Sequence, residues 1–124
     1  MKIIEAISNL DSLKQNTYDQ PDKIRWLSSL DETVKKEIID QYVGADQVIF
    51  NGYTIDTDVN TELLIPAPYD EAYLFWMEAK IDYANGEYGK YNNAMAMFNN
   101  VFDAFAKYYA GNNTPVSHGR RFIF

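Results

Sequence analysis

Three carboxylates recur at helical spacing between residues 68 and 85. Glu71, Glu78 and Asp82 fall on one narrow stripe of the helix that this segment is expected to form, because residues four and seven positions apart share a helix face. Paired carboxylates can carry acid–base chemistry, and a ring of acids can face a pore or an arginine-bearing partner. A solvated helix face requires the fewest assumptions, and the other two interpretations stay open.

A second acidic group has the spacing Asp56-x-Asp58-x-Asn60. This spacing is typical of the start of a calcium-binding loop, which also requires Gly at its sixth position and Glu at its twelfth. Here those positions hold Thr61 and Ala67. The pattern therefore predicts an ordinary polar loop without a metal.

Two further residues could carry chemistry. Lys80 lies opposite the acidic stripe, where its ammonium group either reaches past apolar side chains to water or meets an acid of a neighbouring copy. His118 is the one histidine of the chain, and it has no acid or nucleophile at a fixed distance, so we expect it to be solvated. With no nucleophile–base pair, phosphate loop or metal-ligand set in the sequence, we predict that the chain is not an enzyme and uses no cofactor.

The C-terminal segment combines charge and apolar residues. Arg120 and Arg121 precede Phe122, Ile123 and Phe124. Large apolar side chains are seldom left exposed, because they promote aggregation. We therefore expect this segment either to fold back or to dock on another molecule, as extended apolar segments do.

The elements that must position these residues are helical. Of the 124 residues, 1–110 are expected to form one domain and 111–124 a flexible docking tail. Apolar periodicity predicts helices over 3–14, 20–28, 30–43, 68–85 and 90–109. Residues 45–66 predict an extended loop or a short β-hairpin. The expected fold is all-α, a small bundle of four to five helices.

Two helix boundaries follow from particular residues. Asp19 and Pro21 suit a helix start. A break near Ser29 is inferred because one unbroken helix would place Asp31 on its apolar arc, whereas Ser29 and Glu32 can form a capping box for a new helix. Gly44 suits the end of that second helix.

The 68–85 helix is almost entirely apolar apart from the acidic stripe and Lys80. Trp76 is its largest side chain. A helix this apolar cannot lie on the surface of a small monomer. It is therefore either the central helix of the bundle or a helix that a neighbouring copy covers on one side.

Charge is unevenly distributed along the chain. The net charge is −7, and residues 45–88 carry nine acids with Lys80 as their one base. Residues 89–124 carry Asp103 against four bases. An acidic chain is unsuited to general nucleic-acid binding, and no apolar run reaches membrane-spanning length, so neither partner is expected. The acidic middle and the basic end can attract each other within a chain or between copies.

Three segments of the sequence resemble small proteins of tailed bacteriophages of Gram-positive hosts, in the head–tail connector (neck adaptor) group. The segments are 22–31 (DKIRWLSSLD), 61–70 (TELLIPAPYD) and 82–93 (DYANGEYGKYNN). The resemblance implies a helical subunit that forms a homo-oligomeric ring, bound to the portal protein above and a tail-side connector protein below. It also implies a place in the virion neck, with assembly in the host cytoplasm, and no catalytic residues.

These expectations define one hypothesis and one alternative. The first is a structural connector whose candidate interface residues are Asp56, Asp58, Glu71, Trp76, Glu78, Lys80, Asp82, Arg120, Arg121, Phe122 and Phe124. The alternative is a small acidic phage-encoded inhibitor or DNA mimic that binds a host factor. The negative charge favours the alternative, whereas the concentrated apolar residues favour the connector.

Overall fold

The computed structural model describes residues 1–116, which form four α-helices and three short 3-10 helices and contain no strand. The predicted all-α fold is confirmed. The helices are α1 (Ile3–Leu13), α2 (Gln20–Glu37), η1 (Ile39–Gln41), η2 (Ala45–Gln47), η3 (Tyr69–Glu71), α3 (Ala72–Ala84) and α4 (Tyr88–Asn112).

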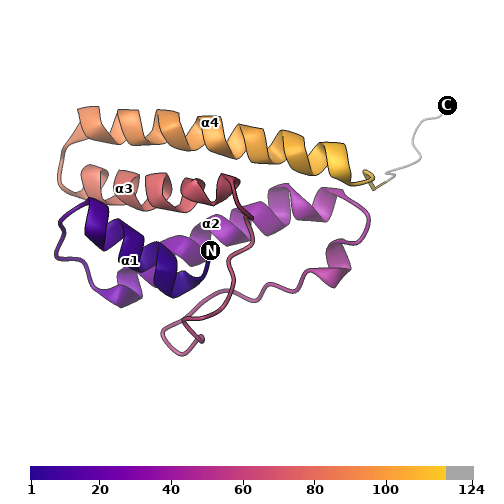
Figure 1. Ribbon diagram of the computed structural model, residues 1–124, viewed down its shortest axis with the longest axis horizontal. Coiled ribbons are helices and arrows are strands. Elements are labelled where there is room, and N and C mark those ends of the chain that lie inside the picture. The colour runs from indigo at the N-terminus through magenta and orange to yellow at the C-terminus, as the bar shows by residue number, and fades with distance from the viewer. Residues whose placement is uncertain (117–124) are drawn as a thin grey trace.

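Helix α3 is the central element. It forms an antiparallel hairpin with α4, while α1 and α2 lie on its other side (Figure 1). Its contacts with three helices explain why nearly all of its residues are apolar. Of the two explanations offered for this composition, the central position within one chain is the one that the structure supports.

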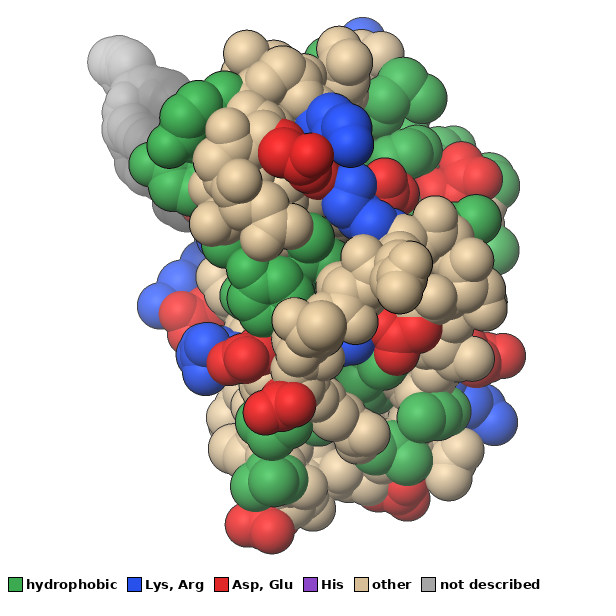
Figure 2. Space-filling view, turned by 90° about the vertical axis from the view of Figure 1, so that its left-hand side faces the viewer, with side chains coloured by type: hydrophobic (Ala, Val, Ile, Leu, Met, Phe, Trp, Pro, Cys, Tyr) green, Lys and Arg blue, Asp and Glu red, His purple; other side chains and the backbone are tan. Residues whose placement is uncertain are grey.

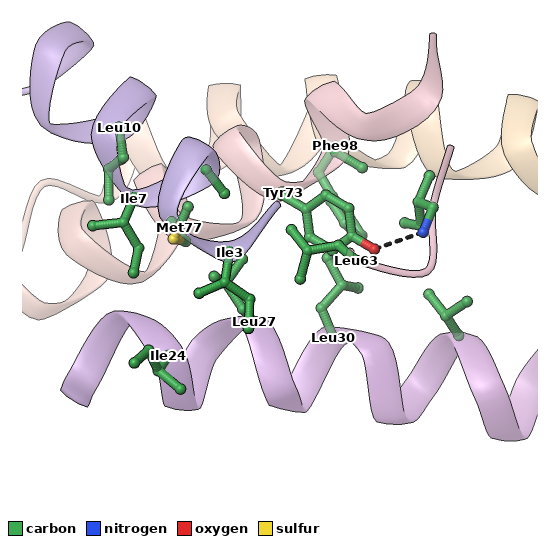
Figure 3. Packing of buried hydrophobic residues seen from close by; sticks show 14 of the residues in the cluster. Ile3, Ile7, Leu10, Ile24, Leu27, Leu30, Leu63, Tyr73, Met77 and Phe98 are labelled. Carbon is green, nitrogen blue, oxygen red and sulfur yellow. Dashed lines mark hydrogen bonds between the residues drawn. The ribbon is translucent and has the colours of Figure 1, made fainter. Parts of the chain in front are cut away.

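The core forms where α1, α2 and α3 meet. Figure 3 shows Ile3 and Ile7 of α1 close to Met77 of α3, on the side that faces α2. Ile3, Leu10, Tyr73 and Met77 are fully buried. Burial of a side chain of this size stabilises the fold by about 1.5–3 kcal/mol, so these residues fix how the three helices pack.

Helix α2 is continuous where a break was predicted, and that prediction is wrong. Asp31 does lie on the apolar arc, and it is completely buried. Protein donors satisfy its carboxylate, so the helix has no need to end before it. The predicted start is confirmed, with Asp19 at the N-cap and Pro21 in the first turn. The α-helix ends at Glu37, and η1 and η2 follow it.

The segment between η2 and η3 is an extended loop without a β-hairpin. The chain at 61–63 runs beside the N-terminus, where Leu63 N–H donates to the Met1 carbonyl at 2.9 Å and Ile3 N–H donates to Thr61 O at 3.0 Å. The Ile4 N–H likewise donates to Val59 O at 2.9 Å. The loop thus satisfies N–H groups of the first turn of α1, which have no partner within the helix.

Helix α4 extends three residues beyond its predicted end. Past it, Val43 N–H donates to Thr114 O and Val116 N–H donates to Gln41 O, so residues 114–116 lie beside η1. The predicted tail therefore begins with residues that are held against the domain. Its other part, including His118, Arg120, Arg121, Phe122 and Phe124, lies outside the described residues.

Candidate protein-interaction surface

The acidic stripe of α3 does not form one solvated face. Asp82 is buried, and its Oδ1 lies 2.7 Å from the Lys14 ammonium group at the end of α1. This ion pair supplies the counter-charge that the buried carboxylate needs. The interpretation of the stripe as a solvated face is wrong for Asp82, because the end of α1 covers this part of α3.

The other two stripe residues differ from Asp82 and from each other. Glu78 is half-buried, and burial raises the pKa of its carboxyl; nearby Lys14 opposes that shift and Asp82 adds to it. Glu71 ends η3 and is exposed. Three such different environments do not make one acidic surface, and Glu71 alone is fully open to solvent.

On α3 and α4 the structure forms a groove with aromatic walls, which we call the aromatic groove. The groove has a volume of about 460 Å³, and its walls are Trp76, Ala79, Lys80, Tyr83, Tyr91 and Met95. This volume is within the range of protein binding sites, about 300–1,000 Å³. Two of the candidate interface residues, Trp76 and Lys80, therefore line the same groove, and its volume is large enough for a binding site.

Lys80 is held against an aromatic ring. Its Nζ lies 4.5 Å from the centre of the Trp76 ring, a cation–π contact. Trp76 is itself fixed, because its Nε1–H donates to the Trp26 carbonyl at 2.9 Å and its ring packs on Phe98. Within residues 1–116, Lys80 makes no ion pair. The groove therefore presents a positive charge that no carboxylate of the described chain neutralises.

Tyrosines extend the groove across the α3–α4 turn. Tyr83 packs edge-on against Tyr88 and Tyr91, with ring centres 5.6 and 5.3 Å apart. Despite these contacts, Tyr83 and Tyr88 are 60% and 59% exposed. Tyrosine is enriched at protein interfaces, where its ring can be buried while its hydroxyl stays hydrated.

The loop between η2 and η3 also carries exposed apolar side chains. Ile49 and Ile55 are 79% and 69% exposed. Residues 54–57 form a tight turn, the loop tip, closed by a bond from Thr57 N–H to Thr54 O at 3.0 Å. Ile55 and Asp56 occupy the two central positions of this turn, so the loop tip presents an apolar side chain beside a carboxylate.

The loop tip is anchored to the core through Asp31. Tyr53 N–H donates to Ser28 Oγ at 2.9 Å, and the Tyr53 hydroxyl donates to Asp31 Oδ2 at 2.5 Å. On the other side of Asp31, Tyr73 O–H donates to Oδ1, and Leu64 N–H donates to Oδ2. We call Asp31, Tyr53, Tyr73 and the Leu64 N–H the Asp31 cluster.

Burial changes the acidities in the Asp31 cluster. It raises the pKa of the Asp31 carboxyl, and the hydrogen bonds from Tyr53, Tyr73 and Leu64 only partly oppose that shift. Burial also raises the pKa of Tyr73 and Tyr53, and the adjacent Asp31 charge adds to both shifts. Both tyrosines therefore remain donors. Sequence reasoning missed this cluster, although Asp31 on the apolar arc of one unbroken helix was its signal.

Figure 2 views the end of the molecule where α3 turns into α4. Acidic and basic side chains are interspersed there, and the apolar groups form several separate areas. Within residues 1–116, no three acids or histidines form a group that could bind a metal. No helix in that range is long and apolar enough to cross a membrane.

The chain was compared with protein-family models, with curated proteins and with solved structures, and none of them matches it. A function must therefore be argued from the chain's own residues and from the surfaces that they form.

Proposed function

We propose that this chain is a structural protein of a tailed bacteriophage, a head–tail connector subunit that works by binding other proteins. In this role, copies of the chain form a ring below the portal protein and join it to a tail-side protein in the virion neck. The three segments quoted from the sequence, which resemble the connector group, lead to this proposal.

The observation that carries the proposal is an exposed aromatic groove on the bundle, together with exposed isoleucines on the loop between η2 and η3. Helix α3 packs on α1, α2 and α4, and the part of it that lines the groove stays accessible to a partner. Exposed apolar surfaces of this kind are typical of protein interfaces.

Charge supports association with more than one partner surface. Asp56 and Asp58 are exposed on the loop, and Glu71 is exposed at the start of α3. The groove, in contrast, contains the ammonium group of Lys80. Surfaces of opposite charge at separate places on one subunit suit a ring, in which one face of a subunit meets a different face of the next.

The test is assembly with the portal protein of the same phage. The purified chain is mixed with portal rings and examined by sedimentation and by electron microscopy of negatively stained particles. A connector adds a layer of density below the portal ring, and it co-sediments with the portal at a fixed stoichiometry. A matched control replaces the portal with an unrelated ring-shaped protein.

The same experiment separates the alternative function. An inhibitor or DNA mimic would remain small, would leave the portal ring unchanged, and would be recovered bound to a host protein. The connector proposal would be contradicted if the chain sedimented separately from the portal even when both proteins were present at high concentration.

A further inference from the structure

We infer that the loop tip of one copy docks in the aromatic groove of the next, with Ile55 entering the groove and Asp56 pairing with Lys80. This contact joins two different surfaces, so it is heterologous and can close a ring. The inference deepens the proposed function and rests on it, since the ring itself is part of that proposal. In a ring each copy binds its neighbour in the same way, and this contact would be the one that repeats.

The two surfaces are chemically complementary. The groove provides aromatic walls from Trp76, Tyr83 and Tyr91 and an ammonium group without an ion-pair partner in residues 1–116. The loop tip provides an isoleucine that is 69% exposed beside an exposed carboxylate. Apolar burial supplies affinity, and the charge pair fixes the orientation in which the loop tip enters.

Both surfaces are rigid before they meet. In the loop tip, Thr54 N–H donates to Thr57 Oγ1 at 2.8 Å and Asp56 N–H donates to Thr54 Oγ1 at 3.2 Å, in addition to the bond that closes the turn. In the groove, the Trp76 ring is fixed by its bond to Trp26 and its contact with Phe98. Little conformational entropy is lost when two preorganised surfaces bind.

The loop tip cannot fill the groove of its own copy. The Asp31 cluster holds the chain on one side of the turn, at Tyr53. On the other side, Val59 O and Thr61 O accept hydrogen bonds from the first turn of α1. In Figure 1 the loop lies at the bottom of the molecule and the α3–α4 hairpin at the top, with α1 and α2 between them. A loop tip that docks in the groove must therefore come from a second copy.

The test exchanges the two charges. Asp56→Lys and Lys80→Glu variants are prepared separately, and each is checked for its native helical content by circular dichroism. Self-association of the full chain is measured without any portal protein, by sedimentation velocity over a range of concentrations at low salt, where screening is weak. Asp103→Lys and Lys107→Glu serve as matched controls, since they make the same charge changes at exposed positions of α4.

The wild-type chain and both controls are expected to self-associate, and each exchange variant to do so about tenfold more weakly. An equimolar mixture of Asp56→Lys and Lys80→Glu should regain association, because the reversed pair and the original pair both form between the two variants. A further variant, Ile55→Ser, should weaken association without changing any charge.

Three results would overturn the inference. They are a wild-type chain that stays monomeric at every concentration, exchange variants that associate as the controls do, and a mixture that fails to regain association. Loss of association on removal of residues 117–124, with the exchange variants unaffected, would assign the groove to the C-terminal segment instead. Portal binding is measured separately, so a chain that binds the portal but does not self-associate contradicts this contact and not the connector role.

Discussion

At the scale of single residues, a central feature of this protein is a buried acid that has no cationic partner among residues 1–116. Asp31 is fully buried, and its carboxylate accepts hydrogen bonds from two tyrosine hydroxyls and one backbone N–H. A buried charge is costly unless hydrogen bonds satisfy it. Since Tyr53 and Leu64 belong to the loop and Tyr73 to α3, the cluster joins the loop to two helices at one point.

Removing this acceptor is expected to destabilise the fold strongly. Asp31→Ala leaves three buried or half-buried donors without an acceptor, and each unsatisfied donor costs about 1–3 kcal/mol. We expect a loss of about 3 kcal/mol or more in the free energy of unfolding, measured by urea denaturation. Asp31→Ala combined with Tyr53→Phe should recover part of this loss, because the Tyr53 hydroxyl, whose one described hydrogen bond is to Asp31, is then no longer stranded. A double variant less stable than the sum of both single changes would contradict this account.

The raised pKa of Asp31 predicts how stability depends on pH. Between the ordinary aspartate pKa of about 3.9 and the raised pKa of the folded state, only the folded chain binds a proton at Asp31. Lowering the pH through this window therefore stabilises the wild type relative to Asp31→Asn, which cannot titrate. Asp11 acts in the opposite direction in both proteins, because its hydrogen bond with Lys23 lowers its pKa and is lost as pH falls.

The measurement is the difference in free energy of unfolding between the wild type and Asp31→Asn, at steps from about pH 7 to about pH 3, which spans the ordinary aspartate pKa. The contribution of Asp11 cancels in this difference. We expect the difference to move in favour of the wild type as pH falls, and then to level off below the ordinary aspartate pKa. A constant difference would show that Asp31 keeps its ordinary pKa in the folded chain.

At the scale of elements, α3 serves both the core and the surface. Its Tyr73 and Met77 are buried among α1 and α2, whereas Trp76, Lys80 and Tyr83 line the aromatic groove with α4. One helix can do both because residues four positions apart share a face while intervening residues point elsewhere. Packing of α3 in the core therefore also fixes the positions of the α3 residues that line the groove.

Trp76 is expected to contribute to stability as well as to the groove. Trp76→Ala removes the ring's contact with Phe98 and its hydrogen bond to the Trp26 carbonyl. Because the ring is half-buried, we expect a loss of about 3 kcal/mol, at the lower end of the range for core aromatics. Trp76→Phe should cost about 1 kcal/mol, since it keeps most of the ring contact and loses the hydrogen bond. Both losses are measured by thermal unfolding. Equal losses of stability for Trp76→Ala and Trp76→Phe would show that the ring contact with Phe98 contributes little.

At the scale of the whole molecule, the described residues form one helical bundle. Its buried side chains come from almost the whole length of the chain, from Ile3 in α1 to Phe105 in α4. Residues 114–116 add backbone hydrogen bonds to Gln41 and Val43. The fold thus uses the chain up to residue 116, and in the proposed connector the surfaces left over are available to neighbours.

Two deletions test where the folded domain ends. Removal of residues 117–124 is expected to shift the Tm by less than about 2 °C, since it leaves every described contact in place. Removal of 113–124 also takes away the bonds to Gln41 and Val43, so the Tm should fall further. A large fall on the shorter deletion would show that the C-terminal segment belongs to the core. In the connector proposal, the shorter deletion still weakens binding to the portal.

Much of the fold follows from local sequence. Apolar spacing predicts α1, α3 and α4, and the Asp19 and Pro21 pair correctly predicts where α2 begins. These features depend on helix periodicity and capping, which act within a few residues of the chain. The apolar composition of α3 also predicts its central position as one of two possibilities.

Only the tertiary structure determined which charged residues are buried and which groups they contact. Whether Asp31 ends a helix or lies inside one depends on Tyr53, Leu64 and Tyr73, which are 22 to 42 residues away in the sequence. Whether Asp82 is solvated depends on Lys14 of another helix. The free energy of a charge is set by the donors, counter-charges and water around it, and folding brings these together from distant parts of the chain.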